Sequence, residues 1–249
     1  MKAGTRLGLT LLSAYLVFLL ATLPAPLVLN KFGARLAPLT VYDVSGSLWS
    51  GHAGTVNYAA LRILNLDWSL HPLALLLGRL ETGWSLDDPA LRGKGALGRT
   101  LGGTHYLSNV QATSELQAMQ SSGLLKILLP VNGQVQFALD TLRYSDGKLS
   151  TAEGSIDIKN VATTVPALAL GDFHINLETQ QAGIKATLSD VSGALRAQGV
   201  ALIKPDGSYQ FTGNFSARDP NQADLQQYLR MLGRMGPDGR VSVTTNGHL

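Results

Sequence analysis

The first arrangement of residues that could carry chemistry is rich in glycine. The stretch RGKGALG matches G-x-G-x-x-G at Gly93, Gly95 and Gly98, the spacing of a loop that holds a dinucleotide pyrophosphate. That chemistry needs a hydrophobic strand before the glycines and a helix after them, and the preceding residues SLDDPALR do not form such a strand. We therefore interpret the stretch as a glycine-rich loop without a cofactor.

Histidines are the next residues whose chemistry depends on spacing. The chain holds five of them, His52, His71, His105, His174 and His248. No two have the separation of an H-x-x-x-H zinc motif, and the absence of cysteine excludes thiolate ligands, thiol nucleophiles and disulfides. A G-x-S-x-G elbow and a Walker loop are also missing. The adjacent Asp87 and Asp88 precede Pro89, so we interpret them as part of a turn and not as a catalytic carboxylate pair. We predict a protein that is not an enzyme, with no catalytic residue, no metal and no small-molecule substrate.

The formal charge of +3 and the pI near 9.2 raise the question of a nucleic-acid partner. Recognition of nucleic acid requires a basic patch, and no cluster of lysine and arginine with interleaved aromatic residues occurs in the sequence. We expect no nucleic-acid partner.

The N-terminus predicts a membrane span. An uncharged run extends from Leu7 to Leu23, and apolar character continues to Leu29. A helix over residues 7–29 would be about 35 Å long, enough for the hydrocarbon core of a bilayer. A cleaved signal peptide is the alternative, but Leu23-Pro24-Ala25 is a poor processing site, which favours an uncleaved signal-anchor.

The charges that flank the run orient this anchor. The amino group, Lys2 and Arg6 precede it, whereas Lys31 and Arg35 follow it, an excess of about one positive charge on the N-terminal side. We therefore expect a cytoplasmic tail at 1–6, a transmembrane anchor at 7–29, and a periplasmic domain at 30–249 in a single-pass protein of the bacterial inner (plasma) membrane. Two sub-parts, about 40–130 and 131–249, would divide that domain.

The rest of the chain alternates between apolar and polar residues with period two. Residues 64–71 are apolar at each even position, and the same pattern recurs at 80–86, 135–139, 173–177 and 209–215. Asp-Gly pairs in SDGK and PDGS predict hairpins at 134–159 and about 194–217. The fold class is mainly β, an antiparallel sheet domain built as a sandwich or a curved sheet with short helices.

Two helices are expected between the strands. Pro72 suits the first turn of a short helix that Gly78 ends and that packs on the sheet. In the second, Leu225, Tyr228, Leu229 and Leu232 share one face of a helix over 219–233, which would cap an edge or end of the sheet.

The stretch SGSLWSG at 45–51 places a tryptophan between glycines. A glycine-assisted bulge would let Leu48 and Trp49 reach the same core. Large aromatic residues contribute heavily to core burial, so we interpret Trp49, Trp68 and Trp84 as core residues and not as ligand contacts.

These residues carry a resemblance to a known family. VSGSLWSGHAGTV followed by LRILNLDWSLHPLALLLGRL resembles the signature region of type II secretion system protein N, also called general secretion pathway protein N. The signature residues, which we expect to be structural, are Gly46, Leu48, Trp49, Ser50, Gly51, Trp68, Leu70, Pro72 and Gly78. The segment ALRAQGVALIKPDGSYQFTGNFSARDPNQADLQQYLRMLG is similar to the family's C-terminal hairpin and helix.

The resemblance implies a non-enzymatic accessory component of the type II secretion system. Its partners would be the inner-membrane platform subunits, the outer-membrane secretin, or both. The strand pattern is also loosely similar to AsmA-like proteins, which implies an alternative function in periplasmic lipid binding or transfer. One-sided alternation is expected equally when a second sheet closes the apolar face, so the pattern leaves both functions open.

Overall fold

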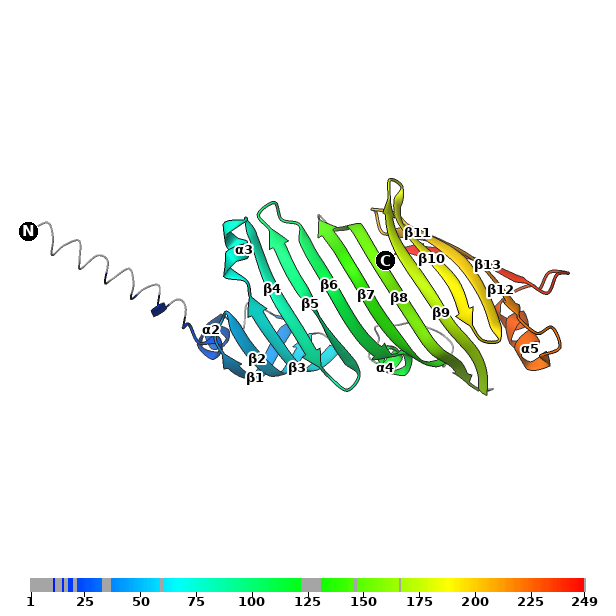
Figure 1. Cartoon of the computed structure of the whole chain (residues 1–249), viewed down its shortest axis with the longest axis horizontal. Helices are drawn as coiled ribbons and strands as arrows, with labels where there is room; N and C mark the ends of the chain where they lie inside the picture. The colour runs from blue at the N-terminus through cyan, green and yellow to red at the C-terminus, as the bar shows by residue number, and fades with distance from the viewer. Residues whose placement is uncertain are drawn as a thin grey trace, which may run out of the picture. The chain divides into compact units, whose positions relative to one another are not determined.

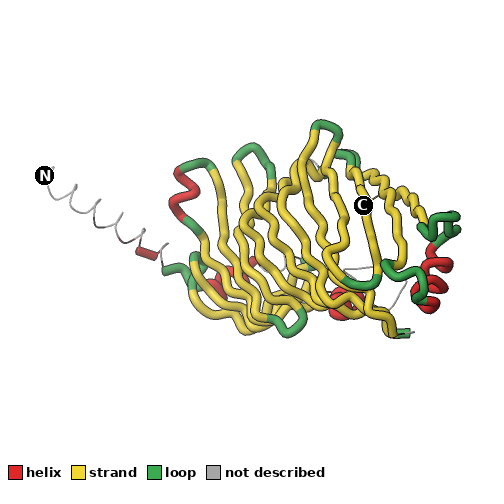
Figure 2. Tube along the Cα trace, turned by 45° about the vertical axis from the view of Figure 1, so that its right-hand side comes forward, coloured by secondary structure: helices red, strands yellow, loops and turns green. Residues whose placement is uncertain are grey.

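A computed structural model describes residues 11, 15, 18, 19, 22–32, 37–58, 61–121, 131–145, 147–165 and 167–248. The chain divides into two compact units, Met1–Asp88 (unit 1) and Pro89–Leu249 (unit 2). Antiparallel strands account for most of the described residues of both units, which confirms the prediction of a mainly β fold (Figures 1 and 2). We expected sub-parts of the domain that meet near residue 130; the compact units meet after Asp88.

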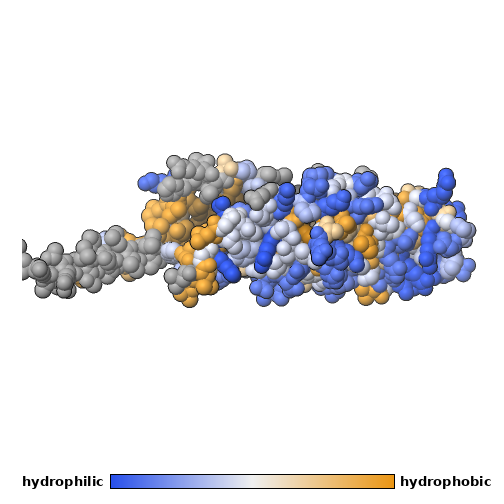
Figure 3. All heavy atoms as spheres, turned by 90° about the horizontal axis from the view of Figure 1, so that it is seen from above, coloured by the Kyte–Doolittle hydropathy of each residue, from blue (hydrophilic) through white to orange (hydrophobic). Residues whose placement is uncertain are grey.

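From Ala25 onward, the described part of unit 1 is a small sheet with two short helices. Its strands lie in sequence order, each antiparallel to the next. Its elements are α2 (Ala25–Phe32), β1 (Leu39–Gly46), β2 (Ser50–Tyr58), β3 (Leu61–Leu70), α3 (Pro72–Leu76) and β4 (Arg79–Asp87). In the space-filling view, hydrophobic residues gather on the surface of unit 1, at the left (Figure 3).

Unit 2 is built in the same way, and its strands β7 to β9 are longer than those of unit 1. Consecutive strands pair antiparallel throughout. The elements are β5 (Leu91–Thr100), β6 (His105–Glu115), α4 (Leu116–Ser121), β7 (Val131–Ser145), β8 (Lys148–Thr164), β9 (Ala167–Gln180), β10 (Gly183–Ser192), β11 (Leu195–Ile203), β12 (Ser208–Ala217), α5 (Ala223–Leu232) and β13 (Val241–His248).

Both predicted hairpins are confirmed. Gln134 lies opposite Lys159 across β7 and β8, and Leu195 lies opposite Ala217 across β11 and β12. In the second turn Gly207 has a φ of +86°, and the Lys204 N–H donates to the Ser208 carbonyl over 2.8 Å. A glycine is suited to this turn because other residues seldom adopt a positive φ.

One face of the unit 2 sheet is apolar and the other is polar. Residues in register share a face, and the row Phe137, Ile156, Ile175 and Leu188 crosses β7 to β10 on the apolar side. The neighbouring row on the opposite face is polar: Gln136, Asp157, His174 and Ser189. The described strands of unit 2 form a single run in which β13 pairs with no strand other than β12, so the sheet is open and the sandwich alternative was wrong. The first residue of β13, Val241, also forms an isolated bridge with Met235.

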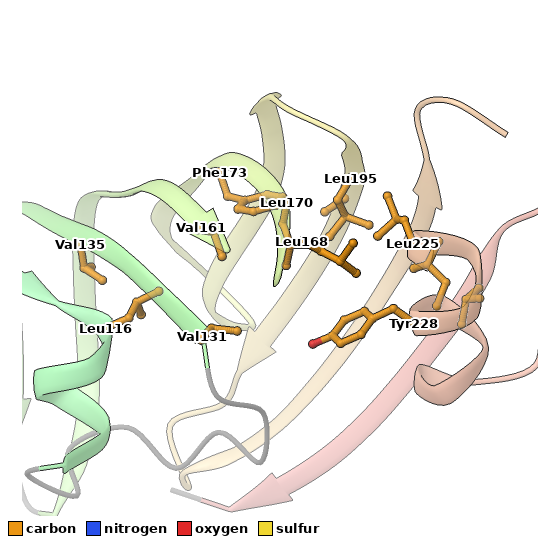
Figure 4. Close-up of a cluster of buried hydrophobic side chains, with 13 residues drawn as sticks. Leu116, Val131, Val135, Val161, Leu168, Leu170, Phe173, Leu195, Leu225 and Tyr228 are labelled. Atoms are coloured by element: carbon orange, nitrogen blue, oxygen red, sulfur yellow. The ribbon is translucent and has the colours of Figure 1, made fainter. Parts of the chain in front are cut away.

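The core of unit 2 lies where helices cover the apolar face. Helix α5 places Leu225 and Tyr228 against the sheet (Figure 4). Leu229 of the same helix is fully buried. Leu168, Leu170 and Leu195 are among the strand residues in the same cluster. The predicted apolar face of the 219–233 helix is confirmed for these three positions, whereas Leu232 is partly exposed. Helix α5 therefore stabilises the sheet with its apolar side.

About half of the expected span at 7–29, residues 7–10, 12–14, 16–17 and 20–21, lies outside the described residues. No helix within the described ranges has the length and apolar composition needed to cross a bilayer. The C-terminal part of the expected span instead belongs to α2, which contacts β1 and buries Ala25. Leu11, Tyr15, Phe18 and Leu19 are helical and exposed.

Candidate functional site

The signature residues come together at one end of unit 1. Five lie in or beside the turn between β1 and β2, two lie at the end of β3, and Pro72 and Gly78 lie in the connection to β4. Ser50 pairs with Ser69, so the turn and the end of β3 are neighbours. We call residues 46–51, 68–70 and the 71–80 connection together the turn end of unit 1.

A tight turn explains Gly46 and its neighbours. Gly46 has a φ of +87°, and a Cβ there would lie 2.6 Å from the Ser50 carbonyl oxygen. The Ser47 N–H donates to the Ser50 carbonyl over 2.9 Å, and the Ser50 N–H donates to Ser47 Oγ over 3.1 Å. Any side chain at position 46 would therefore strain the backbone and collide with it.

Trp68 of β3 contacts and stabilises this turn. Its indole Nε1 donates to the Leu48 carbonyl over 3.2 Å. Gly51 lies directly opposite, and a Cβ on it would approach Cε2 of the indole to 2.8 Å. On the other side Trp68 lies opposite Trp84 of β4. The signature pair Gly51 and Trp68 is thus a close contact between a backbone and an aromatic ring.

We expected the three tryptophans to be core residues, and none of them is fully buried. Trp49, Trp68 and Trp84 are each half-buried, because within the described part of unit 1 no second sheet covers the first. Trp49 lies in the β1–β2 turn and not in a strand bulge, and its carbonyl accepts a 2.6 Å hydrogen bond from the Leu70 N–H.

The turn end also receives the chain from the N-terminal segment. The Leu48 N–H donates to the Leu23 carbonyl over 2.8 Å, and Pro24 forms a β-bridge with Ser47. Helix α2 begins at Ala25 and contacts β1. Residues of both elements line a hollow of about 410 Å³. Unit 1 is therefore connected at this end, through hydrogen bonds, to the residues that end the uncharged N-terminal run.

Helix α3 forms the connection from β3 to β4. The predicted short helix is confirmed, with Pro72 in its first turn and Gly78 at a φ of +69° behind it. The helix contacts β4, yet large apolar side chains of the connection face solvent. Leu73 is 75%, Leu75 48%, Leu77 76% and Leu80 51% exposed.

The residues considered for catalysis or metal binding are dispersed. Gly93, Gly95 and Gly98 lie within strand β5, so the expected glycine loop was wrong; Gly93 and Gly98 allow close approach of β6 side chains. His52 Nδ1 lies 2.8 Å from Asp67 Oδ1, and His174 Nδ1 lies 2.7 Å from Asp157 Oδ1, both across neighbouring strands. Among the described residues, no group of three or more candidate ligands is placed to hold a metal ion.

Sequence reasoning missed the role of Asp88. Its carboxylate is buried and accepts a 2.9 Å hydrogen bond from the Leu64 N–H of β3. Asn65, at a φ of +51°, donates from Nδ2 to the Asp87 carbonyl over 3.2 Å. The expected turn before Pro89 is thus also a junction that ties the end of β4 to β3. An aspartate next to a proline was the available signal, but its partner is distant in sequence.

Strand β13 is an edge of the unit 2 sheet. It pairs with β12 over eight consecutive residues without a register shift, from Val241 to His248. Residues 241–247 read VSVTTNG, which contains no charge and no proline. Proline, lysine and bulges are the usual protection of an exposed edge, so β13 offers backbone groups to an added strand. In unit 1, by contrast, α2 contacts the edge strand β1.

Comparison with known proteins gives a family for this arrangement. The family model described as "Type II secretion system (T2SS), protein N" matches residues 37–244, which include every signature residue. The chain belongs to the type II secretion system protein N family. Membership implies a role in type II secretion, in a family of accessory components with no known enzymatic activity.

Individual relatives match the chain over all or nearly all of their length. The chain is 28% identical to type II secretion system protein N of Aeromonas hydrophila and 24% identical to that of Vibrio cholerae serotype O1, each over all of both chains. It is 26% identical to type II secretion system protein N of Klebsiella pneumoniae, over 97% of this chain and 94% of the relative. No solved structure matches the chain.

Proposed function

We propose that the chain is a single-pass accessory component of the type II secretion system in the inner membrane, with both units in the periplasm. The domain acts by contact with the platform subunits, the secretin, or both, and catalyses no reaction. The family match over residues 37–244 is the observation that carries this proposal. The signature residues form a turn and not a reactive site, and this supports a role in assembly.

Membrane attachment rests on the uncharged run from Leu7 to Leu23. With α2 packed on β1, the span is shorter than first expected and ends near Leu23, and about 17 residues still suffice for a bilayer. A periplasm-active phosphatase fused after Leu249 should be active and should sediment with membranes. Activity of a cytoplasmic reporter at that position would refute the orientation.

The contact itself is best assigned to β13. An edge strand binds an extended partner segment through main-chain hydrogen bonds. The alternative contact, helix α5, has its apolar side occupied by the core, since Leu225, Tyr228 and Leu229 are buried. We therefore place partner binding on the sheet edge and assign α5 to stabilising the sheet beside it.

Proline substitution separates edge pairing from folding. The N–H groups of consecutive strand residues point to opposite sides, so only one of Thr244 and Thr245 directs its N–H away from β12. We expect one of Thr244→Pro and Thr245→Pro to leave the melting temperature unchanged and to reduce exoprotein secretion several-fold. Secretion at the normal level in the variant that remains stable would refute the edge contact.

Lipid handling of the AsmA-like kind is the second candidate. The observation in its favour is the apolar row of the open unit 2 sheet, where Phe137, Ile156, Ile175 and Leu188 are only half-buried. A hollow of about 720 Å³ in the same unit is lined by Asp140, Glu153 and Glu178, which suits no acyl chain. Stoichiometric phospholipid on the purified chain, detected by mass spectrometry, would favour this candidate.

A further inference from the structure

The exposed leucines of the α3 connection are concentrated in a short segment. Leu73, Leu75, Leu77 and Leu80 are each about half or more exposed, although they lie within eight consecutive residues. Single exposed apolar residues are common, but a contiguous group marks a surface that contacts an apolar phase or partner. Figure 3 shows hydrophobic residues gathered on the surface of unit 1, the unit that contains α3.

One cation, Arg79, lies among these leucines, and Glu81 follows the last of them. From Asp67 to Glu81 the sequence contains no other carboxylate, and it contains Arg79. His71 lies in the same connection, with Nδ1 3.4 Å from Glu81 Oε1. Arg79 is exposed, and leucines next to an exposed cation suit a surface that combines acyl chains with anionic headgroups.

The location of the patch indicates which apolar phase it meets. The patch belongs to the turn end, the same end of the unit 1 sheet where the Leu48 N–H binds the Leu23 carbonyl and Pro24 bridges Ser47. Leu23 ends the uncharged run that we propose as the anchor. The chain therefore leaves the proposed span and enters unit 1 at the end that carries the leucines.

We propose that the α3 connection, residues 72–80, rests on the membrane surface and places Leu73 and Leu77 among the lipid headgroups and upper acyl chains. The proposal rests on the membrane attachment described above. Trp49 lies half-buried at the same end, and tryptophan is enriched at membrane interfaces. The short hydrogen-bonded link to Leu23 would hold the patch against the bilayer, which makes lipid the occupant and not a distant protein.

The absence of cysteine allows a direct test with single labels. Leu73→Cys and Leu77→Cys in the full chain carry an environment-sensitive fluorophore, and Tyr58→Cys is the control. Tyr58 is 55% exposed at the other end of β2. The length of β2 puts it about 26 Å from the turn. The proteins are reconstituted in vesicles of phosphatidylethanolamine and phosphatidylglycerol that contain a lipid spin-labelled near the headgroup.

We expect quenching several-fold stronger at positions 73 and 77 than at 58. Equal quenching at all three positions would overturn the proposal. Labels shielded from aqueous iodide but not quenched by the lipid would also overturn it, because a protein or a second copy would then cover the patch. Should one leucine variant melt early, Leu80→Cys replaces it.

Resistance to carbonate extraction, measured on the same samples, separates this proposal from the anchor. An anchored chain with unquenched labels refutes the surface contact and leaves the anchor standing. An extractable chain whose labels are still quenched supports the surface contact and refutes the anchor. The two proposals therefore fail independently.

Discussion

Replacing Trp68 with alanine should destabilise unit 1 by about 3.5 kcal/mol. A fully packed tryptophan buries about 150–250 Å². Trp68 is half-buried. The substitution therefore removes about 100 Å² of contact, worth about 2.5 kcal/mol at about 25 cal/mol/Å². Loss of the indole hydrogen bond to the Leu48 carbonyl adds about 1 kcal/mol.

Intrinsic fluorescence is a suitable assay because all three tryptophans, Trp49, Trp68 and Trp84, belong to unit 1. Urea unfolding of the full chain in detergent, followed by fluorescence, reports that unit, while circular dichroism reports both. Trp68→Phe is the matched control: it keeps most of the apolar contact and should cost about 1 kcal/mol through the lost N–H donor. A Trp68→Ala loss below about 1 kcal/mol would refute the packing argument. Normal stability with failed secretion would instead point to a partner contact.

Two further predictions concern unit 2. Leu229→Ala, at a fully buried position of α5, should cost about 2–5 kcal/mol in urea unfolding, whereas Met231→Ala, at a 73% exposed position of the same helix, should cost less than about 0.5 kcal/mol; similar losses would contradict the placement of the helix. Hydrogen bonds from the Asn160 N–H and from Ser192 Oγ lower the pKa of Asp172. A lowered folded-state pKa adds stability that is present above the unfolded value near 3.9 and is lost as the pH falls through the folded value. Asp172→Asn should therefore lower the melting temperature at pH 7 and lower it less as the pH falls below the unfolded value; a pH-independent effect would exclude this linkage.

Local signals in the sequence predicted the strands, hairpins and helices well. The turn before Ser208 needs a residue with positive φ, which Gly207 supplies. The Asp-Gly pair therefore predicts a turn regardless of where the hairpin lies in the fold. The spacing of Leu225, Tyr228 and Leu229 likewise indicates one helix face whatever that face contacts. Such signals depend on neighbours in sequence, so they are visible without the fold.

Features that depend on distant partners were predicted poorly. The burial of Trp68 depends on whether a second layer covers unit 1, which alternation along one strand does not reveal. The glycines at 93 and 98 were expected in a loop, but they serve strand β5 by allowing Ala112 and Tyr106 of β6 to approach closely. Asp88 binds a backbone N–H 24 residues earlier, and only the fold brings the two together.

Crosslinking in the native host tests the central claim, contact with the secretion machinery, most directly. A photo-crosslinking residue at Thr244 on the exposed edge of β13 is compared with one at Gln198, which is exposed on the interior strand β11. We predict that mass spectrometry of the Thr244 adducts identifies platform subunits or the secretin, and that Gln198 yields far fewer. Two results together would contradict the account and favour lipid handling: crosslinking at Thr244 in the host captures neither component, and the purified chain carries stoichiometric phospholipid.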